Sequence, residues 1–308
     1  MDATIEKDRT LSRKTILHMF TPLTHMSPFD VNMALDAGYE HVVPYTEVTL
    51  GDIGNLVQDA IFSRPPDAGV ATGIFLAGKD AELALDMLDA AKKAMVPPFK
   101  VSVFADPAGS FTTAAAMVAK VEKTLSKLHG RDLKDARIVV FGATGVVGYC
   151  TAVIAAKEGA KVTIVGHDGL VRVSSIAASM GKRFGVTVEA ADGSTDLKKT
   201  DLLQRSDVAL TAARAGVQVL SKAQLSSAPD LLVVADVNAV PPAGVEGLTV
   251  NANGENLEGT TIAGIGPLSI GNVKYKTQAG LFEQMIKAEK PVAFDFQDAF
   301  ALARGLAK

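Results

Sequence analysis

The sequence predicts an α/β protein with two domains, each built around a mostly parallel β-sheet. Two observations predict this class. The chain has 308 residues, about twice the ~150 residues of a usual single domain, so two hydrophobic cores are expected. Short β-branched runs also alternate with longer helical patterns along almost the whole chain, which is typical of parallel βαβ units.

Four strands are expected in the first third of the chain, each short and apolar enough to be buried on both faces. A helix capped by Asp80 runs until Pro97-Pro98 stops it, and a second helix runs from near Thr112 to Gly130. The four expected strands are Ile16–Phe20, His41–Val43, Gly73–Ala77 and Val101–Phe104.

A charged connector over residues 130–136 precedes a new apolar strand, so the main domain boundary is expected there. The first domain then covers residues 1–130 and is completed by the helical C-terminal stretch, residues 276–308. The second domain covers residues 131–275. Its expected strands are Ile138–Gly142, Val162–Gly166, Val208–Ala212, Leu231–Asp236 and Thr261–Gly264.

Composition excludes several function classes. Apolar residues make up 48 % and charged residues 21 % of the chain, which excludes disordered and fibrous proteins. The formal net charge is −3 and no block of Lys and Arg occurs, so no nucleic-acid partner is expected. The single cysteine, Cys150, excludes an intramolecular disulfide framework and fits a reducing compartment. We therefore expect a small-molecule partner.

The N-terminal segment is polar, with charges of both signs, and no run of 18 uncharged apolar residues occurs in the chain. These features predict a cytoplasmic protein with no membrane partner. Residues 1–12 are expected to form a frayed tail.

A glycine-rich turn follows the first strand of the second domain, where residues 142–148 read Gly-Ala-Thr-Gly-Val-Val-Gly and lead into a helix. Such a turn brings backbone N–H groups to a pyrophosphate at a helix N-terminus, where the helix dipole favours negative charge. Ala143 stands where the usual G-x-G-x-x-G pattern has its first glycine. We predict a Rossmann-like, dinucleotide-binding domain, the alternative being a tight turn that binds nothing. The predicted binding residues are Gly142, Thr144, Gly145, Val146, Val147 and Gly148, with Ala212 and Asn238 at the ends of later strands.

The end of the next strand reads Gly166-His167-Asp168, where the adenosine ribose of a dinucleotide is sensed. The carboxylate of Asp168 suits a free ribose hydroxyl, whereas His167 and Arg172 suit a 2′-phosphate. The sequence therefore predicts use of both NAD and NADP. A solvent-exposed His-Asp turn at a helix start is the alternative.

Three segments rich in turn and small polar residues follow expected strands, where open α/β sheets place ligands. They are residues 24–32, residues 106–113 and residues 236–242. In the first segment Ser27 or Asp30 can instead cap the next helix, and a helix cap is also the alternative for the second segment.

The five histidines show no metal-ligand spacing, and no zinc-protease, nucleophile-elbow or Walker motif is present, so no metal site and no acyl-transfer chemistry are expected. The basic pair Lys274 and Lys276 follows a glycine-rich stretch that reads as a loop. One of the two lysines is expected to face an anionic or carbonyl-rich substrate if this loop lines the cleft, and an exposed surface position is the alternative.

Seven long segments carry distinctive sequences, in chain order HMFTPLTHMSPFDVNMALDAG, IFSRPPDAGVATGIF, FADPAGSFTTAAAMV, FGATGVVG, VGHDG, DVNAVPPAGV and GIGPLSIGNVKYKTQ. With them the chain resembles the bacterial NAD(P)-dependent methylene-tetrahydromethanopterin dehydrogenases of methylotrophs over nearly its full length. The resemblance implies hydride transfer from methylene-tetrahydromethanopterin to NAD or NADP, in the oxidation of formaldehyde-derived one-carbon units. It also implies a homo-oligomer.

The resemblance further implies two α/β domains like those of the bifunctional methylene-tetrahydrofolate dehydrogenase/cyclohydrolases, with the pterin in a cleft between them. It points to a lysine in pterin binding, which we assign to Lys274, although the stretch from Gly264 to Lys276 differs in length from the relative. Lys274 and Asp30 are the expected catalytic residues. The expected substrate-binding residues are Pro28, Phe29, Asp106, Ser110, Phe111 and Thr112.

The strictly NADP-dependent relative has an arginine where this chain has His167, which favours the form that accepts both nucleotides. Two alternatives stay open. One is methylene-tetrahydrofolate dehydrogenase, although no Lys/Tyr pair suited to an added cyclohydrolase activity is evident on a first-domain helix. The other is a non-catalytic NAD(P)-binding sensor, which would have no need of three polar segments at strand ends.

Overall fold

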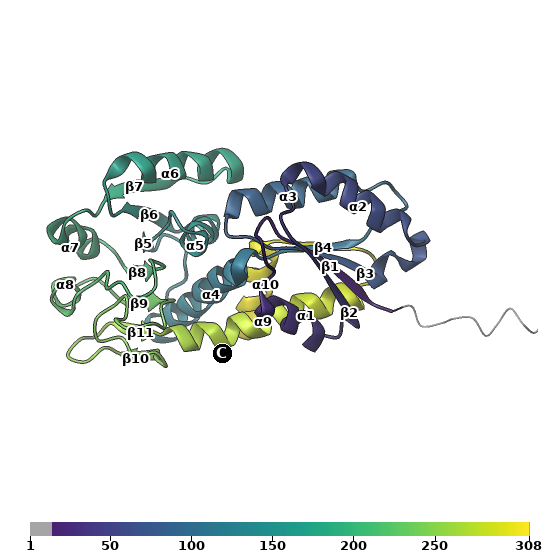
Figure 1. Cartoon of the computed structure of the whole chain (residues 1–308). Coiled ribbons are helices and arrows are strands. Elements are labelled where there is room, and N and C mark those ends of the chain that lie inside the picture. Colours follow the sequence, from purple (N-terminus) through teal and green to yellow (C-terminus); the bar gives the residue numbers. More distant parts are fainter. Residues whose placement is uncertain (1–13, 308) are drawn as a thin grey trace, which may run out of the picture. The chain divides into compact units, whose positions relative to one another are not determined.

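The computed structural model describes residues 14–307, and these divide into two compact units (Figure 1). The first unit comprises the chain up to Ala108 together with Ala279–Asp295. The second comprises Gly109–Gln278 together with the residues from Phe296 onward. The expected tail at residues 1–12 lies outside the described residues.

The first unit contains a parallel sheet with the strand order β12-β4-β3-β1-β2. Helices α2 and α3 lie on one face of this sheet, and α1 lies on the other with the C-terminal part of α9 (Figure 1). The strands are β1 (Ile16–Phe20), β2 (His41–Tyr45), β3 (Thr72–Leu76), β4 (Ser102–Ala105) and β12 (Ala293–Phe294), and the helices are α1 (Pro28–Asp36), α2 (Ile53–Phe62) and α3 (Ala81–Ala94).

Aromatic side chains form the core of the first unit. Phe75 and Phe104, on neighbouring strands, pack edge to face with their ring centroids 5.5 Å apart, and the ring of Phe282 lies 5.4 and 5.3 Å from them. Helix α3 starts where expected, because the carboxylate of Asp80 accepts a hydrogen bond of 2.8 Å from the Leu83 N–H.

The second unit contains a sheet with the strand order β10-β11-β9-β8-β5-β6-β7, parallel except for β10. Strand β5 lies between β6 and β8, so the chain runs from it to β6 and β7 on one side and later to β8 and β9 on the other. The strands are β5 (Arg137–Phe141), β6 (Lys161–Gly166), β7 (Val188–Asp192), β8 (Val208–Thr211), β9 (Val233–Asp236), β10 (Asn253–Asn256) and β11 (Ala263–Ile265). This is the predicted Rossmann-like arrangement, with a switch point between β5 and β8.

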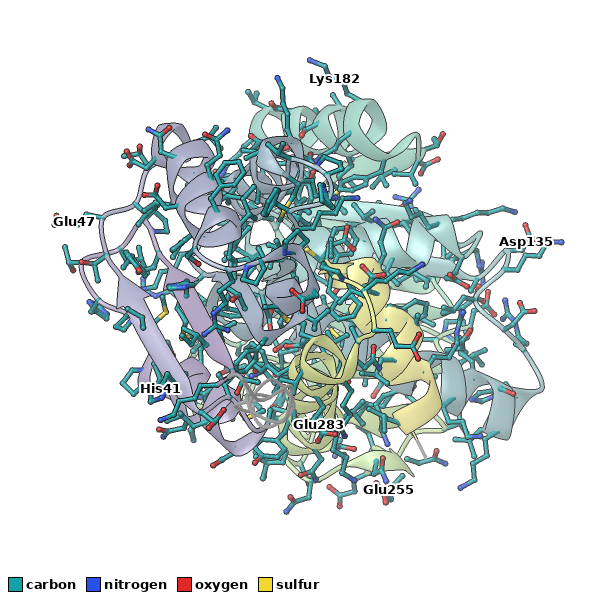
Figure 2. All side chains as sticks on the ribbon, turned by 90° about the vertical axis from the view of Figure 1, so that its right-hand side faces the viewer. His41, Glu47, Asp135, Lys182, Glu255 and Glu283 are labelled. Atoms are coloured by element: carbon teal, nitrogen blue, oxygen red, sulfur yellow. The ribbon has the colours of Figure 1, made fainter. Side chains whose placement is uncertain are left out.

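Helices cover the second sheet, and the charged side chains of its surface, such as Lys182 and Asp135, point outward (Figure 2). Helix α4 packs against α5 and α10, where the rings of Phe111 and Phe296 meet edge to face at 5.4 Å. The helices are α4 (Ser110–His129), α5 (Val146–Lys157), α6 (Leu170–Phe184), α7 (Asp196–Gln204), α8 (Lys222–Ser226), α9 (Pro267–Lys287) and α10 (Phe296–Leu306), with 3₁₀ turns at Leu50–Asp52, Pro66–Ala71 and Pro107–Gly109.

The division differs from the expected domain boundaries, because α4 and α10 group with the second unit and not with the first. Their mutual packing through Phe111 and Phe296 accounts for this grouping. The C-terminal stretch is not helical throughout, since β12 separates α9 from α10. Which unit binds which substrate stays a prediction. No helix in the described part of the chain is long and apolar enough to cross a membrane.

Candidate functional site

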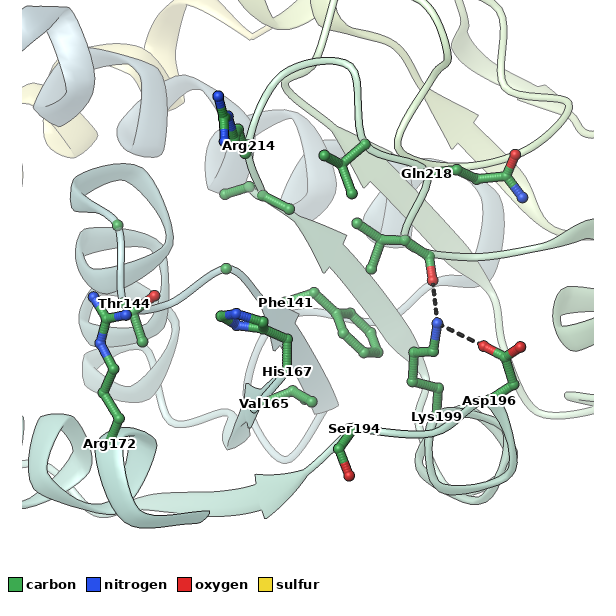
Figure 3. Close-up of a pocket in the computed structure, with 17 residues that line it drawn as sticks. Phe141, Thr144, Val165, His167, Arg172, Ser194, Asp196, Lys199, Arg214 and Gln218 are labelled. Carbon is green, nitrogen blue, oxygen red and sulfur yellow. Dashed lines mark hydrogen bonds and ion pairs between the residues drawn. The ribbon is translucent and has the colours of Figure 1, made fainter. Parts of the chain in front are cut away.

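A pocket of about 790 Å³ lies at the carboxyl ends of strands β5, β6, β7 and β8, within the second unit (Figure 3). Its size is in the range of small-molecule and cofactor sites. The lining residues come from the segments that follow the four strands: Phe141, Gly142, Thr144 and Gly145; Val165, His167 and Arg172; Gly193, Ser194, Asp196 and Lys199; and Ala212, Ala213, Arg214, Val217, Gln218 and Val219.

The glycine-rich turn forms one wall of this pocket, and its backbone is in close contact with neighbouring segments. Gly142 has φ +85°, and a Cβ atom there would lie 2.4 Å from the Ala212 carbonyl oxygen. A Cβ atom at Gly148 would lie 2.5 Å from the Gly142 carbonyl oxygen. Glycine is therefore required at both positions, to turn the chain and to let α5 approach the end of β5.

Helix α5 begins at Val146 with Gly145 as its N-cap, and the Tyr149 N–H donates to the Gly145 carbonyl at 2.9 Å. The first N–H groups of a helix have no partner within it, and the dipole favours an anion there. Among the predicted residues of this turn, Gly142, Thr144 and Gly145 line the pocket. Val146, Val147 and Gly148 do not, and they contribute the backbone of the helix N-terminus instead.

The segment after β6 contributes His167 to the pocket, and the first turn of α6 contributes Arg172 (Figure 3). The His167 side chain is 80 % exposed, and its Nδ1 lies 4.0 Å from Oδ1 of Asp168. Asp168 itself does not line the pocket. The groups that reach the pocket from this strand end are thus the imidazole and the guanidinium, the pair that suits a 2′-phosphate.

Five polar lining residues were not expected from the sequence: Ser194, Asp196, Lys199, Arg214 and Gln218. The Lys199 ammonium donates to the Val219 carbonyl at 3.0 Å and pairs with Asp196 Oδ1 at 2.8 Å (Figure 3). The hydrogen bond from Lys199 lowers the pKa of Asp196. The signal for three of these residues was a strand at Val188–Asp192 with the helix cap Thr195 after it, which had not been recognised.

Positive charge dominates the lining. Among the described residues that line the pocket, Arg172, Lys199 and Arg214 are cationic, and Asp196 carries the opposing charge. Together with the N-terminus of α5 this arrangement suits a ligand with phosphate groups. Of the other two residues predicted to bind the cofactor, Ala212 lines the pocket, whereas Asn238 lies in the loop after β9 and does not.

The predicted substrate residues of the first unit lie in the segments that follow strands β1 and β4. Pro28, Phe29 and Asp30 form the first turn of α1, directly after the N-cap Ser27; the side chain of Phe29 is 47 % exposed and Asp30 is buried. Asp106 follows β4 and is buried. The N-cap Ser27 makes no side-chain cap hydrogen bond for this helix.

The predicted substrate residues of the second unit lie in and near α4. Ser110, Phe111 and Thr112 form its first turn and are buried, and the Thr112 hydroxyl donates to the Gly109 carbonyl at 3.2 Å. Lys274 was expected in a loop, but it lies on α9, which begins at Pro267. Its ammonium donates to Gln278 Oε1 at 2.5 Å. Roles in substrate binding stay predictions for all these residues.

Within residues 14–307, no cluster of three or more His, Cys, Asp and Glu side chains is arranged to hold a metal ion. The features of the pocket that can bind a ligand are the glycine-rich turn, the helix N-terminus and the charged side chains named above.

Comparisons with known proteins give the family. Residues 28–108 match the family model described as methylene-tetrahydromethanopterin dehydrogenase, N-terminal. A Methylorubrum extorquens protein named bifunctional protein MdtA is 32 % identical over 297 residues, which cover 96 % of this chain and 100 % of that protein. The solved NAD-dependent malic enzyme from Thermotoga maritima is similar in fold, with a TM-score of 0.58 and 15 % identity over 96 % of this chain and 85 % of that chain.

The NAD(P)-dependent methylenetetrahydromethanopterin dehydrogenase of Methylorubrum extorquens is 57 % identical over 290 residues, which cover 94 % of this chain and 98 % of that protein. This match extends through the glycine-rich turn and the pocket of the second unit as well as the first unit. The resemblance found in the sequence is thereby confirmed. The chain belongs to the family of NAD(P)-dependent methylenetetrahydromethanopterin dehydrogenases.

Proposed function

We propose that this protein oxidises methylene-tetrahydromethanopterin to the methenyl form and passes the hydride to NAD or NADP. The observation that carries the proposal is the 57 % identity to a protein of that name over nearly the full length of both chains. The pocket supports it, because its glycine-rich turn, helix N-terminus and cations suit a dinucleotide.

The reaction needs little acid or base chemistry from the protein. The methylene carbon lies between two nitrogens, so the C–H bond breaks with both electrons leaving as hydride, and the nitrogens stabilise the cation that remains. The hydride forms a new C–H bond at C4 of the nicotinamide, and no proton is transferred in that step. The protein's task is orientation, with the two carbons held within ~3–3.5 Å of each other.

The pocket is the proposed site of the adenosine and pyrophosphate part of the dinucleotide. The pyrophosphate is placed at the N-terminus of α5, against the backbone of Gly142 and Gly145. His167 and Arg172 are placed at the adenosine ribose, where they accommodate either a hydroxyl or a 2′-phosphate. Lys199, whose ammonium is held by the Val219 carbonyl and Asp196, contributes a further cation to the lining of this pocket.

The pterin contacts are proposed from the resemblance together with placement at strand ends. Asp30 and Lys274 are the residues proposed to bind the reacting pterin. The remaining proposed contacts are Pro28, Phe29, Asp106, Ser110, Phe111 and Thr112. Phe29 supports this assignment, because an exposed aromatic ring after a parallel strand is suited to stacking on a flat ring system.

The cellular setting is proposed on the same basis. The protein is expected to act as a cytoplasmic homo-oligomer in the oxidation of formaldehyde-derived one-carbon units, without a nucleic-acid or membrane partner.

The experiment that tests the proposal is absorbance-monitored reduction of NAD and of NADP, each supplied with methylene-tetrahydromethanopterin and with methylene-tetrahydrofolate. Turnover of the methanopterin substrate with both nucleotides is the expected result. Turnover of the folate alone would assign the protein to the folate version of the reaction. Nucleotide binding without any turnover would identify a sensor and refute the proposal.

A further inference from the structure

A buried carboxylate joins two loops next to the nucleotide pocket. Asp236 is the last residue of β9, lies beside Thr211 of β8 and is 1 % exposed. Its Oδ1 accepts from the Thr211 hydroxyl at 2.7 Å and from the Asn238 N–H at 3.2 Å, and its Oδ2 accepts from the Gly244 N–H at 2.8 Å. One carboxylate thus receives bonds from the end of β8 and from both ends of the loop over residues 237–244.

The loop over residues 237–244, here called the β9 loop, is also held internally by Asn238. The Asn238 amide donates to the Pro242 carbonyl at 3.0 Å, and its oxygen accepts from the Val240 N–H at 2.9 Å. The Asn238 side chain, predicted to bind the cofactor, is therefore engaged in shaping this loop.

The β9 loop is tied in turn to the pocket wall. The Gly244 carbonyl accepts from the Val219 N–H at 2.7 Å and from the Leu220 N–H at 3.0 Å. Val219 lines the pocket, and its own carbonyl receives the Lys199 ammonium. A continuous chain of hydrogen bonds thus runs from Asp236 through the β9 loop to the pocket.

The hydrogen bonds around Asp236 lie where the nicotinamide half of a bound dinucleotide is expected. The pyrophosphate belongs at the N-terminus of α5, after strand β5, and the β6 and β7 ends carry the groups suited to the adenosine half. A dinucleotide that crosses the switch point places its nicotinamide half over the carboxyl ends of β8 and β9. Asp236 joins those two strand ends.

Gly244 packs directly against the Asp236 carboxylate. A Cβ atom added at Gly244 would lie 2.8 Å from Oδ2 and 2.9 Å from Oδ1 of Asp236. Burial raises the pKa of the Asp236 carboxyl, and the bonds from Thr211, Asn238 and Gly244 act against that rise by stabilising its ionised form. The carboxylate is therefore held in one geometry by several groups at once.

We propose that Asp236 is a positioning residue for hydride transfer, whose carboxylate holds the β9 loop and the end of β8 in the arrangement that orients the nicotinamide ring. The inference rests on the proposed function. Because Asp236 is buried, it acts through the loop and not by contact with the nicotinamide. A displacement of about 1 Å at the reacting atoms costs on the order of a hundredfold in rate, so loss of this network should slow the hydride step far more than it weakens adenosine binding.

The test compares ligands with and without the nicotinamide. ADP-ribose carries the adenosine and pyrophosphate part, so its affinity reports the pocket alone, whereas single-turnover reduction of NAD by methylene-tetrahydromethanopterin reports the hydride step. Asp236→Asn keeps the size of the side chain. It replaces one carboxylate oxygen by an NH2 group, which then faces a hydrogen-bond donor and cannot accept from it. We expect the dissociation constant of ADP-ribose to stay within about twofold, and the single-turnover rate to fall on the order of a hundredfold.

Two further variants and a control keep the test decisive if Asp236→Asn does not fold. Thr211→Val removes one donor without changing shape, and Gly244→Ala displaces the carboxylate without changing a polar group. Both should slow the hydride step while ADP-ribose binds normally. Asp230→Asn, an exposed carboxylate on the same unit, should leave both readouts unchanged.

Three results would overturn the inference. Folded Thr211→Val and Gly244→Ala proteins with a normal single-turnover rate would show that the network does not orient the nicotinamide. Parallel losses of ADP-ribose affinity and hydride transfer would show a general structural role. A wild-type protein that binds ADP-ribose but transfers no hydride to NAD or NADP would refute the proposed function first, and the inference with it.

Discussion

Replacing Gly142 by alanine should lower the folding stability of the second unit and displace the backbone that lines its nucleotide pocket. Gly142 has φ +85°, a conformation that costs an L-residue roughly 1–3 kcal/mol. The new Cβ atom would lie 2.4 Å from the Ala212 carbonyl oxygen and 2.7 Å from the Ala213 nitrogen, so that backbone must move at an overpacking cost of about 1–3 kcal/mol. The total is about 2–6 kcal/mol, and Ala212 and Ala213 both line the pocket.

The matched control is Gly145→Ala, three residues further along the same turn. Gly145 has φ −97°, and its Cβ position lies 3.4 Å from the nearest atom, the Gly142 carbonyl oxygen. Folding stability should therefore change by no more than about 0.5 kcal/mol. The added methyl group lies in the pocket wall, however, and should separate the backbone from the pyrophosphate, which raises the dissociation constant of NADH about tenfold or more, equivalent to ~1.4 kcal/mol.

Thermal unfolding followed by circular dichroism and titration with NADH followed by fluorescence separate the two effects. A unit of this size loses ~2–4 °C in melting temperature per kcal/mol, so Gly142→Ala should lower the melting temperature by roughly 4–24 °C and abolish NADH binding. Gly145→Ala should lose affinity alone. A Gly142→Ala protein with wild-type stability, or a Gly145→Ala protein with wild-type NADH affinity, would refute the reasoning.

Three further outcomes are expected. His167→Arg should shift the ratio of kcat/KM toward NADP, because a guanidinium pairs with the 2′-phosphate in bidentate fashion; an unchanged ratio would place His167 away from the ribose. Lys274→Met and Asp30→Asn should raise KM for the pterin more than they slow single-turnover hydride transfer, and complete loss of that step with normal pterin affinity would contradict the absence of an essential base. Burial alone would raise the pKa of Asp207, but hydrogen bonds from two arginines outweigh it and hold the pKa well below its usual range, so its stabilisation is present above about pH 4 and is lost as the pH falls further. Asp207→Asn should therefore cost about 1–3 kcal/mol at pH 7 and less at pH 3 in denaturant unfolding, because the two half-exposed arginines stay solvated. An equal cost at both pH values would contradict this explanation.

The strands of the Rossmann-like unit were predictable because buried parallel strands are continuous apolar runs, as at Ile138–Gly142, observed at Arg137–Phe141. The glycine-rich turn was predictable because a positive φ and close backbone approach leave glycine as the fitting residue. Strand β7, Val188–Asp192, was missed because it combines the exposed Glu189 with two half-buried alanines, residue types that give a weak strand pattern. The pocket residues that follow it were missed for the same reason.

Two other features depend on tertiary contacts that no local pattern reveals. Lys274 read as part of a loop because Gly266, Pro267 and Gly271 precede it, yet Pro267 is well suited to the first turn of a helix and the Cβ position of Gly271 is open. The segment over residues 213–219 has no regular period, and it enters the pocket because its end is tied to Gly244. Hydrogen bonds between segments far apart in the sequence therefore determine which residues of this segment line the pocket.

In the proposed reaction, hydride passes directly from the methylene carbon to the nicotinamide, and isotope labelling tests this transfer. Tetrahydromethanopterin condensed with fully deuterated formaldehyde gives a substrate with deuterium at that carbon, and the reduced nucleotide can then be analysed by mass spectrometry and NMR. We expect one deuterium at C4 of NADH and of NADPH when the reaction runs in ordinary water. Reduced nucleotide without deuterium, or with hydrogen drawn from the solvent, would contradict it.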